Sequence, residues 1–216
     1  MAAPRPHVGT LREKPLHASL KRWYAQPGDE IESPVSGFVI DLVRDELLIE
    51  IQTRGFSSMK RKLTSLLEEG HRVRIVHPIP VHKWIVKVDP DGTVASRRRS
   101  PKRGDVVDVF AELVSFPDLV ANPGLEIDLV VTHEEEYRHF DGTRGWRRKG
   151  WVVTERRLLE VVGTLEIRTS GDLAALLPAA LPKPFTTADL AAALSRPRRL
   201  AQQMTYCLRH TGVLEI

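Results

Sequence analysis

The sequence contains a single cysteine, Cys207, among its 216 residues. One cysteine excludes an intramolecular disulfide framework and a zinc finger built from cysteine ligands. No apolar run approaches the ~20 residues that a helix needs to cross a bilayer, and the N-terminus lacks the apolar core of a secretory signal. The sequence has neither a Gly-x-Gly-x-x-Gly nor a Walker motif, so nucleotide-driven work is not indicated. These absences favour a cytoplasmic protein with no membrane partner.

Aromatic residues are also scarce, at 6% of the chain, but hydrophobic residues make up 42% and charged residues 28%. These proportions are close to those of folded globular proteins and differ from those of disordered chains. The 32 Lys and Arg residues exceed the 28 Asp and Glu residues, which gives a net charge of +4. This modest excess permits a nucleic-acid partner without requiring one.

The chain is expected to comprise a flexible arm, a larger domain and a small C-terminal module. Its length allows one large domain, or a medium domain with a small one. Two prolines and a glycine disfavour regular structure at the start, and the composition shifts to Ala, Leu and Pro near residue 178. The expected divisions are therefore 1–10, 11–178 and 179–216.

The larger domain is predicted to be of the α/β class. Residues 37–43 and 47–53 are two apolar, β-rich runs around a charged turn, which is typical of a hairpin. Strands that are almost continuously apolar are usually covered on both faces, so helices are expected above and below this sheet. Further helices are predicted at 11–25, 57–69 with Ser57 as N-cap, and 105–115; strands at 72–77, 81–88 and 125–131; a basic loop at 96–103; and a strand or a buried helix at 158–162.

The C-terminal module is predicted to be a helix-turn-helix. Thr186 or Thr187 can cap a helix over 188–194, and Pro197 suits the first position of a second helix that ends near His210. Residues 212–216 are expected to begin a strand. In a winged-helix-like module that strand forms the first half of the wing, and the wing would be cut short here.

The most informative pattern lies in the predicted hairpin. It consists of Asp41 in the first strand and of Glu50-Ile51-Gln52 in the second. Side chains alternate between the faces of a strand, so Glu50 and Gln52 project to one side. If Asp41 pairs with Glu50, or slips by two residues, it shares that side; an odd slip would separate them. Cross-strand neighbours lie ~5–8 Å apart, a span that one divalent ion can bridge.

Two carboxylates among apolar residues are costly unless a cation or hydrogen-bond donors compensate them. Mg²⁺ (or Mn²⁺) suits this position, because it takes one or two carboxylates together with water and phosphate oxygens. Asp41 and Glu50 are therefore candidate metal ligands and Gln52 a candidate positioning group. The alternative is a buried polar network in which Arg or Lys from neighbouring helices satisfies the three residues.

Residues 11–88 resemble the PD-(D/E)XK nuclease superfamily in the order of their elements. This order is a helix with a Glu, a strand with an Asp, a hairpin, the motif Glu-x-Gln and a basic helix. The resemblance implies a restriction-endonuclease-like mixed central sheet flanked by helices, and Asp41 and Glu50 as its acids. Gln52 stands at the lysine position of the motif, and no proline precedes Asp41. Glu13 would be the first-helix acid, with Glu32 as a second candidate. Lys60 and Lys62 of the next helix could substitute for the missing lysine. The layout also resembles uncharacterised bacterial proteins.

Two basic runs and the helix-turn-helix indicate contact with DNA. Residues 96–103 hold five positive charges in eight positions, and 144–151 interleave tryptophan with arginine, which suits stacking on exposed bases. Each run taken alone is more often a solvated face, and the module is alternatively a dimerisation or protein-binding device. The candidate DNA contacts are Lys60, Lys62, Arg97, Arg98, Arg99, Lys102, Arg103, Arg147, Arg148, Arg196, Arg198, Arg199, Gln202 and Gln203.

These patterns together predict a metal-dependent nuclease that hydrolyses DNA phosphodiester bonds and is targeted by a helix-turn-helix module. A homodimer is compatible with them. The main alternative is a non-catalytic DNA-binding regulator built on an inactivated nuclease fold. A third interpretation is an interaction adaptor that does not touch nucleic acid.

Overall fold

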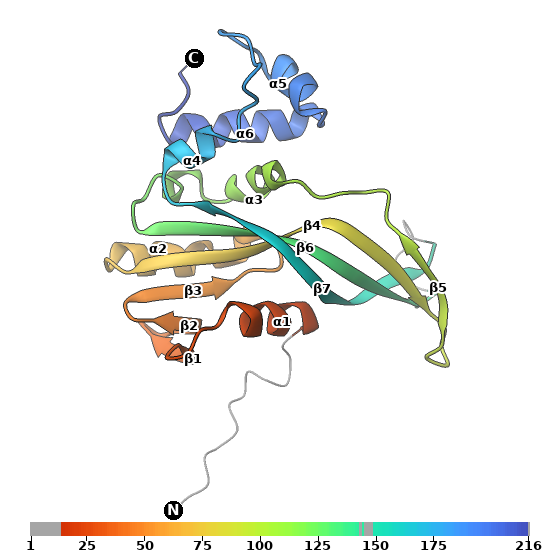
Figure 1. Cartoon of the computed structure of the whole chain (residues 1–216). Coiled ribbons are helices and arrows are strands. Elements are labelled where there is room, and N and C mark those ends of the chain that lie inside the picture. The colour runs from red at the N-terminus through yellow and green to blue at the C-terminus, as the bar shows by residue number, and fades with distance from the viewer. Residues whose placement is uncertain (1–13, 143, 145–148, 216) are drawn as a thin grey trace, which may run out of the picture.

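The computed structural model describes residues 14–142, 144 and 149–215. A seven-stranded sheet runs through the molecule in the order β1-β2-β3-β4-β6-β7, and β5 pairs with β4 away from this path. The strands are β1 (Glu30–Val35), β2 (Phe38–Arg44), β3 (Leu47–Ile51), β4 (Arg72–Val88), β5 (Val94–Arg99), β6 (Leu125–Phe140) and β7 (Trp151–Ile167). The sheet is open, and helices accompany it (Figure 1). The protein therefore has a mixed α/β fold.

The sheet is mixed because the first three strands form antiparallel pairs, whereas β3, β4 and β6 run parallel to one another. Strands β5 and β7 are antiparallel to their neighbours β4 and β6. A parallel neighbour requires a crossover connection, which α2 (Lys60–Glu68) provides between β3 and β4. The hairpin, the crossover helix and the parallel strand therefore follow one another directly along the chain.

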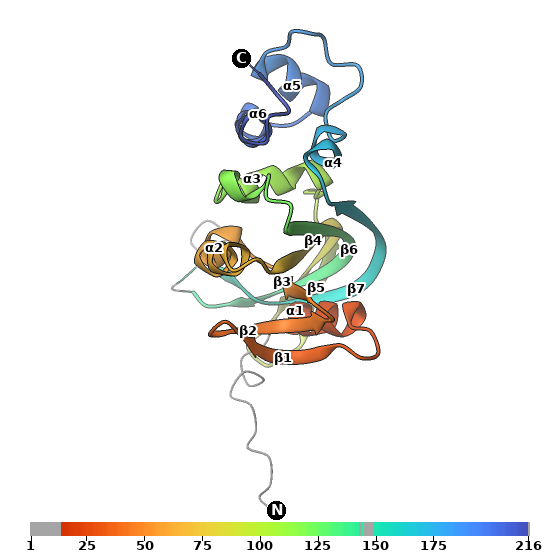
Figure 2. The same ribbon diagram turned by 90° about the vertical axis from the view of Figure 1, so that its left-hand side faces the viewer.

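Helices cover both faces of the sheet, as the apolar strands predict. Helix α1 (Pro15–Tyr24) and helix α2 lie on opposite sides of β3 and β4 (Figure 2). Leu16 and Leu20 of α1, four residues apart, are buried with Ile49 and Val130 in a smaller core. A larger core surrounds Phe56 on the other face. The sheet is consequently buried from two sides around the hairpin.

The larger core is built around short helices that follow β3 and β5. These are η2 (Phe56–Met59), η3 (Val106–Val109), α3 (Phe110–Leu113) and η4 (Pro117–Leu119). The rings of Phe56 and Phe116 stack with centroids 5.6 Å apart, and Phe110 is fully buried beside them. Aromatic burial of this kind ties the segment after β3 to the segment after β5.

The predicted C-terminal helices are present as α5 (Thr187–Leu194) and α6 (Arg198–His210), preceded by α4 (Ser170–Ala174). Thr186 caps α5 in a capping box with Asp189. The buried face of α6 belongs to the same core as α3, over which it lies in Figure 1. Cys207 is on this face, and burial raises the pKa of its thiol to about 12, so it is an inert core residue.

Several predicted elements differ in detail. The structure has an additional strand, β1, and residues 94–99 of the expected basic loop form β5. Residues 72–88 form one strand rather than two, and 158–162 lie inside strand β7. Residue Ser57 caps no helix, since η2 begins at Phe56 and α2 at Lys60. Residues 212–215 form no strand, because the amides of Val213 and Leu214 donate hydrogen bonds back to the carbonyl of Leu208 in α6. In the described part of the chain, no helix is both long enough and apolar enough to span a membrane.

Candidate acidic site and the adjoining pocket

Asp41 and Glu50 lie directly beyond the last paired residues of the hairpin. Leu42 pairs with Ile49, so the positions one step further along are 41 and 50. At this end of the hairpin the amide of Ile51 donates a hydrogen bond to Oδ2 of Asp41 at 2.9 Å. The carboxylate of Asp41 thereby reaches between the two strands. The paired residues have a register in which the sequence predicts a shared face for the two acids. Asp41, however, contacts His17 of α1 and Glu50 contacts Lys62 of α2, and these two helices lie on opposite sides of β3 (Figure 2).

Helix α1 supplies the partners of Asp41. His17 Nε2 lies 3.2 Å from Oδ2 of Asp41, and Lys21 Nζ lies 4.0 Å from Oδ1. Burial opposes ionisation of Asp41, but the hydrogen bonds from His17 and Ile51 and the charge of Lys21 outweigh it, so the pKa of Asp41 falls below its usual value. Lys21 also donates to Glu32 at 2.8 Å, which brings this candidate acid to the same cluster.

Helix α2 supplies the partner of Glu50. Lys62 Nζ lies 2.5 Å from Oε1 of Glu50 and donates to the carbonyl of Val39 at 2.6 Å. Burial raises the pKa of Glu50 above its ordinary value, Lys62 opposes that rise, and the nearby charge of Asp41 adds to it. Two neighbouring carboxylates thus have pKa values displaced in opposite directions, an arrangement that separates acid and base roles in many sites.

Gln52 makes different contacts. Its side-chain amide donates to the carbonyl of Gly55 at 2.8 Å and to Ser58 Oγ at 3.3 Å. Its backbone carbonyl accepts a hydrogen bond from His77 Nδ1 at 2.6 Å. Gln52 therefore braces the turn after β3, and no hydrogen bond joins its amide to Asp41 or Glu50 among the described residues. The basic group beside Glu50 comes from the following helix.

The ion pairs match the polar-network interpretation, because lysines from two helices reach the acids. The side chains of Asp41 and Glu50 nevertheless remain 18% and 13% exposed, so water and a small cation have access to them. Within the described ranges, no group of three or more His, Cys, Asp and Glu side chains is arranged for a metal. Two carboxylates are, however, a sufficient protein contribution for Mg²⁺, which completes its shell with water and substrate oxygens.

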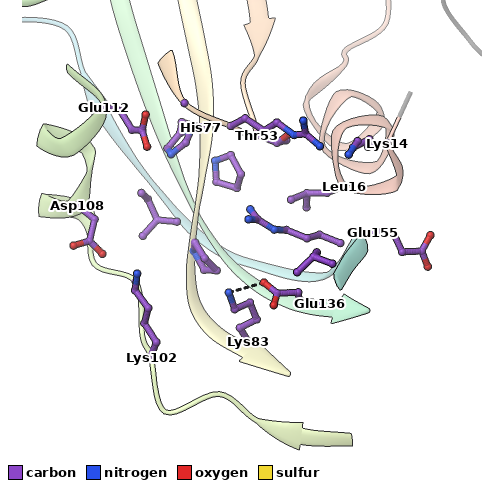
Figure 3. A pocket seen from close by; sticks show the side chains of 18 of the residues that line it. Lys14, Leu16, Thr53, His77, Lys83, Lys102, Asp108, Glu112, Glu136 and Glu155 are labelled. Atoms are coloured by element: carbon purple, nitrogen blue, oxygen red, sulfur yellow. Dashed lines mark hydrogen bonds and ion pairs between the residues drawn. The ribbon is translucent and has the colours of Figure 1, made fainter. Parts of the chain in front are cut away.

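A pocket of about 610 Å³ opens next to this site, along β4. Its wall begins at Thr53, Arg54 and Gly55, directly after Gln52, and continues over His77. Figure 3 shows Lys14 and Leu16 reaching toward it from α1, and Lys102 from the opposite wall. The pocket therefore begins where β3 ends.

Five cationic side chains line this pocket, and the sequence patterns indicated only one of them, Lys102. The others lie at the start of α1, after β3, on β4 and on β7: Lys14, Arg54, Lys83 and Arg156. They are far apart along the chain and belong to no basic run. The pairing of β3 with β4, of β4 with β6 and of β6 with β7, together with the packing of α1 on the sheet, brings them together.

The basic run around β5 has several environments. Arg97 pairs with Glu135 at 2.7 Å and lies 5.0 Å over the ring of Trp84. Arg99 lies 2.6 Å from Nε2 of His82. The remaining members are exposed: Arg98, Lys102 and Arg103, as is Lys60 on α2. The candidates Glu13, Arg147 and Arg148 lie outside the described residues.

The candidate DNA contacts of the C-terminal helices divide into two groups. Arg196 lies 3.3 Å from Asp105 and 3.9 Å from Asp108, so it attaches the turn between α5 and α6 to η3. Arg198 Nε donates to Thr187 at 3.4 Å. The side chains left facing solvent are Arg199, Gln202 and, in part, Gln203.

Residues 14–168 match the model of a family described as a domain of unknown function, DUF8091. The chain belongs to this family. The DUF8091 region contains Asp41, Glu50, Lys62 and the whole pocket, whereas α4, α5 and α6 follow it. An uncharacterized protein of Treponema pallidum (strain Nichols) is 32% identical over 185 residues, which covers 85% of this chain and 73% of that relative. No solved structure matches the chain.

Proposed function

We propose that this protein is a metal-dependent nuclease that hydrolyses DNA phosphodiester bonds at Asp41 and Glu50. The observation that carries the proposal is the pair of neighbouring hairpin carboxylates, Asp41 within 4.0 Å of Lys21 and Glu50 in contact with Lys62. A lysine beside the second acid is the group that the PD-(D/E)XK motif has and that Gln52 does not provide. Helix α2 provides it, as the resemblance allowed.

The order of elements supports the same proposal. Helix α1, the strands β1 to β3, the crossover helix α2 and the parallel strand β4 follow one another, and helices cover both faces. A mixed central sheet flanked by helices, with both acids on the hairpin, is the arrangement that the resemblance implies. The restriction-endonuclease-like fold therefore belongs to this proposal, as does a cytoplasmic location.

Asp41 and Glu50 would hold Mg²⁺ or Mn²⁺, and Oδ1 of Asp41 accepts no hydrogen bond from a described residue. The metal would supply a Lewis acid that activates water and polarises a phosphate. His17 and Lys21 keep Asp41 ionised by favouring its charged form. Lys62 orients Glu50 and places a cationic donor where a phosphate oxygen could accept from it. Helix α6, with Arg199 and Gln202 exposed, would contact the DNA.

A non-catalytic DNA-binding protein is the second candidate function. One observation favours it: Lys62 and Lys21 already offset the charges of Glu50 and Asp41, so the acids do not require a metal for stability. Under this alternative, DNA affinity persists in a chelator and falls steeply with salt, while no cleavage occurs.

Cleavage assays separate the two functions. The purified protein would be mixed with supercoiled, linear and branched DNA in Mg²⁺, Mn²⁺ or EDTA, next to Asp41→Asn, Glu50→Gln and the control Asp45→Asn. Asp45 is an exposed residue of the same hairpin turn. We expect metal-dependent cleavage that falls at least about 100-fold in the two site variants and not in the control. Cleavage that survives both site substitutions would falsify the site, and DNA binding without cleavage by the wild type would support the alternative.

A further inference from the structure

The pocket lies in a gap along one edge of β4. Strand β3 pairs with β4 up to Val76, and β5 pairs with it from Trp84 onward. On this edge the carbonyl of Val76 accepts a hydrogen bond from the amide of Gln52, and the carbonyl of Pro80 accepts one from the amide of Gly104. Every second residue of a strand directs its backbone to the same edge, so position 78 faces the gap too.

Proline explains why this edge stays open. Pro78 and Pro80 have no N–H, so the uncovered edge leaves no amide donor without a partner at these two positions. No further strand is needed to satisfy the edge between β3 and β5. The sequence His77-Pro-Ile-Pro80 therefore interrupts the pairing along this edge and preserves the pocket.

The far wall is held close to β4 by hydrogen bonds from residues 100–104. The amide of Ser100 donates to Lys83 at 2.7 Å, and the amide of Gly104 donates to Pro80 at 2.9 Å. A Cβ at position 104 would lie 2.9 Å from the carbonyl oxygen of Pro80, so the approach requires glycine. This wall closes the gap at the end away from β3.

The acidic side chains that line the pocket have partners within the described part of the chain, whereas most of its cationic side chains do not. Each acidic side chain is already held by a donor of the protein: Glu136 by Lys83, Glu112 by the amide of Phe56, Asp108 by the amide of Asp105, and Glu155 by Arg157. The carboxylate of Glu155 is also directed away from the centre of the pocket (Figure 3). The acids thus leave little negative charge for a further cation.

Four of the five cations have no such partner. No carboxylate of a described residue lies within 4 Å of Lys14, Arg54, Lys102 or Arg156. Helix α1 also directs its N-terminus to this side, with Lys14 and Leu16 in the wall and no acidic residue in its first turn. The positive end of a helix dipole adds to the attraction for an anion. The pocket is therefore suited to a ligand with more than one negative charge.

The other walls are apolar, which limits the kind of anion. They consist of Leu16, Pro78, Ile79, Pro80 and Val153. A volume of about 610 Å³ lies within the range of small-molecule sites. A nucleotide offers both a flat base for the apolar walls and a phosphate for the cations. We infer that this pocket binds one nucleotide through a terminal phosphate group.

The position of the pocket relates this inference to the acidic site. Thr53 in its wall is three residues beyond Glu50, so the Cα atoms of these two residues are at most about 11 Å apart. A DNA strand whose phosphorylated end fills the pocket would extend toward Asp41 and Glu50, because residues 100–104 close the end of the pocket that lies away from β3. As a statement about the nuclease substrate, the inference rests on the proposed function. Phosphate binding itself requires neither Asp41 nor Glu50.

Binding in EDTA tests the inference without catalysis. Fluorescence anisotropy would compare short single-stranded oligonucleotides of one sequence that carry a 5′-phosphate, a 3′-phosphate or only hydroxyl ends, with dAMP as competitor. The variants are Arg54→Gln with Arg156→Gln, and the control Arg22→Gln, an exposed arginine of α1 that does not line the pocket and has no ion pair among the described residues. We expect one phosphorylated end to bind about tenfold more tightly than the hydroxyl ends.

The double variant should lose this preference, the control should keep it, and circular dichroism should show both folded. Equal affinity for all ends, or a preference that survives in the double variant, would overturn the inference. Displacement of the labelled phosphorylated strand by dAMP would support the assignment of the pocket to a single terminal nucleotide. The preference for a phosphorylated end should persist in Asp41→Asn, so failed cleavage and a failed phosphate site give different results.

Discussion

Glu134 is a buried acid, 1% exposed, on strand β6 behind the pocket. Thr132 Oγ1 donates to its Oε1 at 2.9 Å, but its Oε2 accepts no hydrogen bond from a described residue. Burial raises the pKa of Glu134, and the charges of Arg156 and Lys83 only partly oppose this. An ionised Glu134 is therefore costly in the folded protein.

The pH dependence of stability should reveal this cost. The folded-state pKa of Glu134 lies above its unfolded value near 4.5. The protonated side chain therefore contributes to the free energy of unfolding at acidic pH, and this contribution is lost as the pH rises through the folded-state pKa. Relative to Glu134→Gln, the wild type should lose free energy of unfolding between acidic and neutral pH. Urea denaturation at a series of pH values measures this, with the exposed Glu46→Gln as control. Parallel profiles for the wild type and Glu134→Gln would contradict it.

The Glu50–Lys62 pair gives a second residue-scale prediction. Both side chains are less than one-fifth exposed, so Lys62→Met leaves a desolvated carboxylate without its partner. A double-mutant cycle with Glu50→Gln should give a coupling free energy of about 1–3 kcal/mol, measured by urea denaturation. A coupling near zero would show that the pair is too hydrated to stabilise the fold.

At the scale of elements, β4 organises the site because it receives partners on both edges. The two prolines made its sequence look like two strands, yet the strand continues through them since its other edge pairs with β6. The sequence predicted a basic loop where strand β5 lies. In the structure Arg97 pairs with Val86 and Arg98 pairs with Ile85 of β4. Local composition favours a loop there, and pairing with β4 overrides it.

Gly104 tests the wall that closes the pocket. In Gly104→Ala the new methyl group would meet the carbonyl of Pro80, so the segment must move away from β4. We expect a loss of about 1–3 kcal/mol in the free energy of unfolding. Gly163→Ala in β7 is the matched control, because its added Cβ would meet nothing within 4 Å. Equal effects of the two substitutions, measured by urea denaturation, would show that the wall is not tightly held.

At the scale of the whole molecule, the C-terminal helices share the larger core with α3. Met204 and Leu208 of α6 are fully buried in the cluster that contains Phe110. The domain boundary near residue 178 stays a prediction. The cooperativity of unfolding shows whether the parts before and after it unfold separately.

Met204→Ala should lower the free energy of unfolding by about 2–5 kcal/mol, because it leaves a cavity between α6 and the rest of the core. Tyr206→Ala on the same helix, where the side chain is 46% exposed, should have a much smaller effect. If the molecule unfolds as one unit, a single urea transition moves in Met204→Ala. Two transitions, of which only one moves, would instead indicate an independent C-terminal module.

Sequence alone determined the hairpin, the helices on both faces and the C-terminal pair of helices, because apolar periodicity and caps are local properties. It also singled out Asp41 and Glu50 as candidates, because two acids stand out among apolar strand residues; their role as a site stays a prediction. Only the tertiary structure decided that Lys62, His17 and Lys21 meet these acids and that Gln52 braces a turn. It alone assembled the cationic pocket, because Lys14, Arg54 and Arg156 come together through strand pairing and the packing of α1 on the sheet, contacts between distant segments that no local pattern encodes.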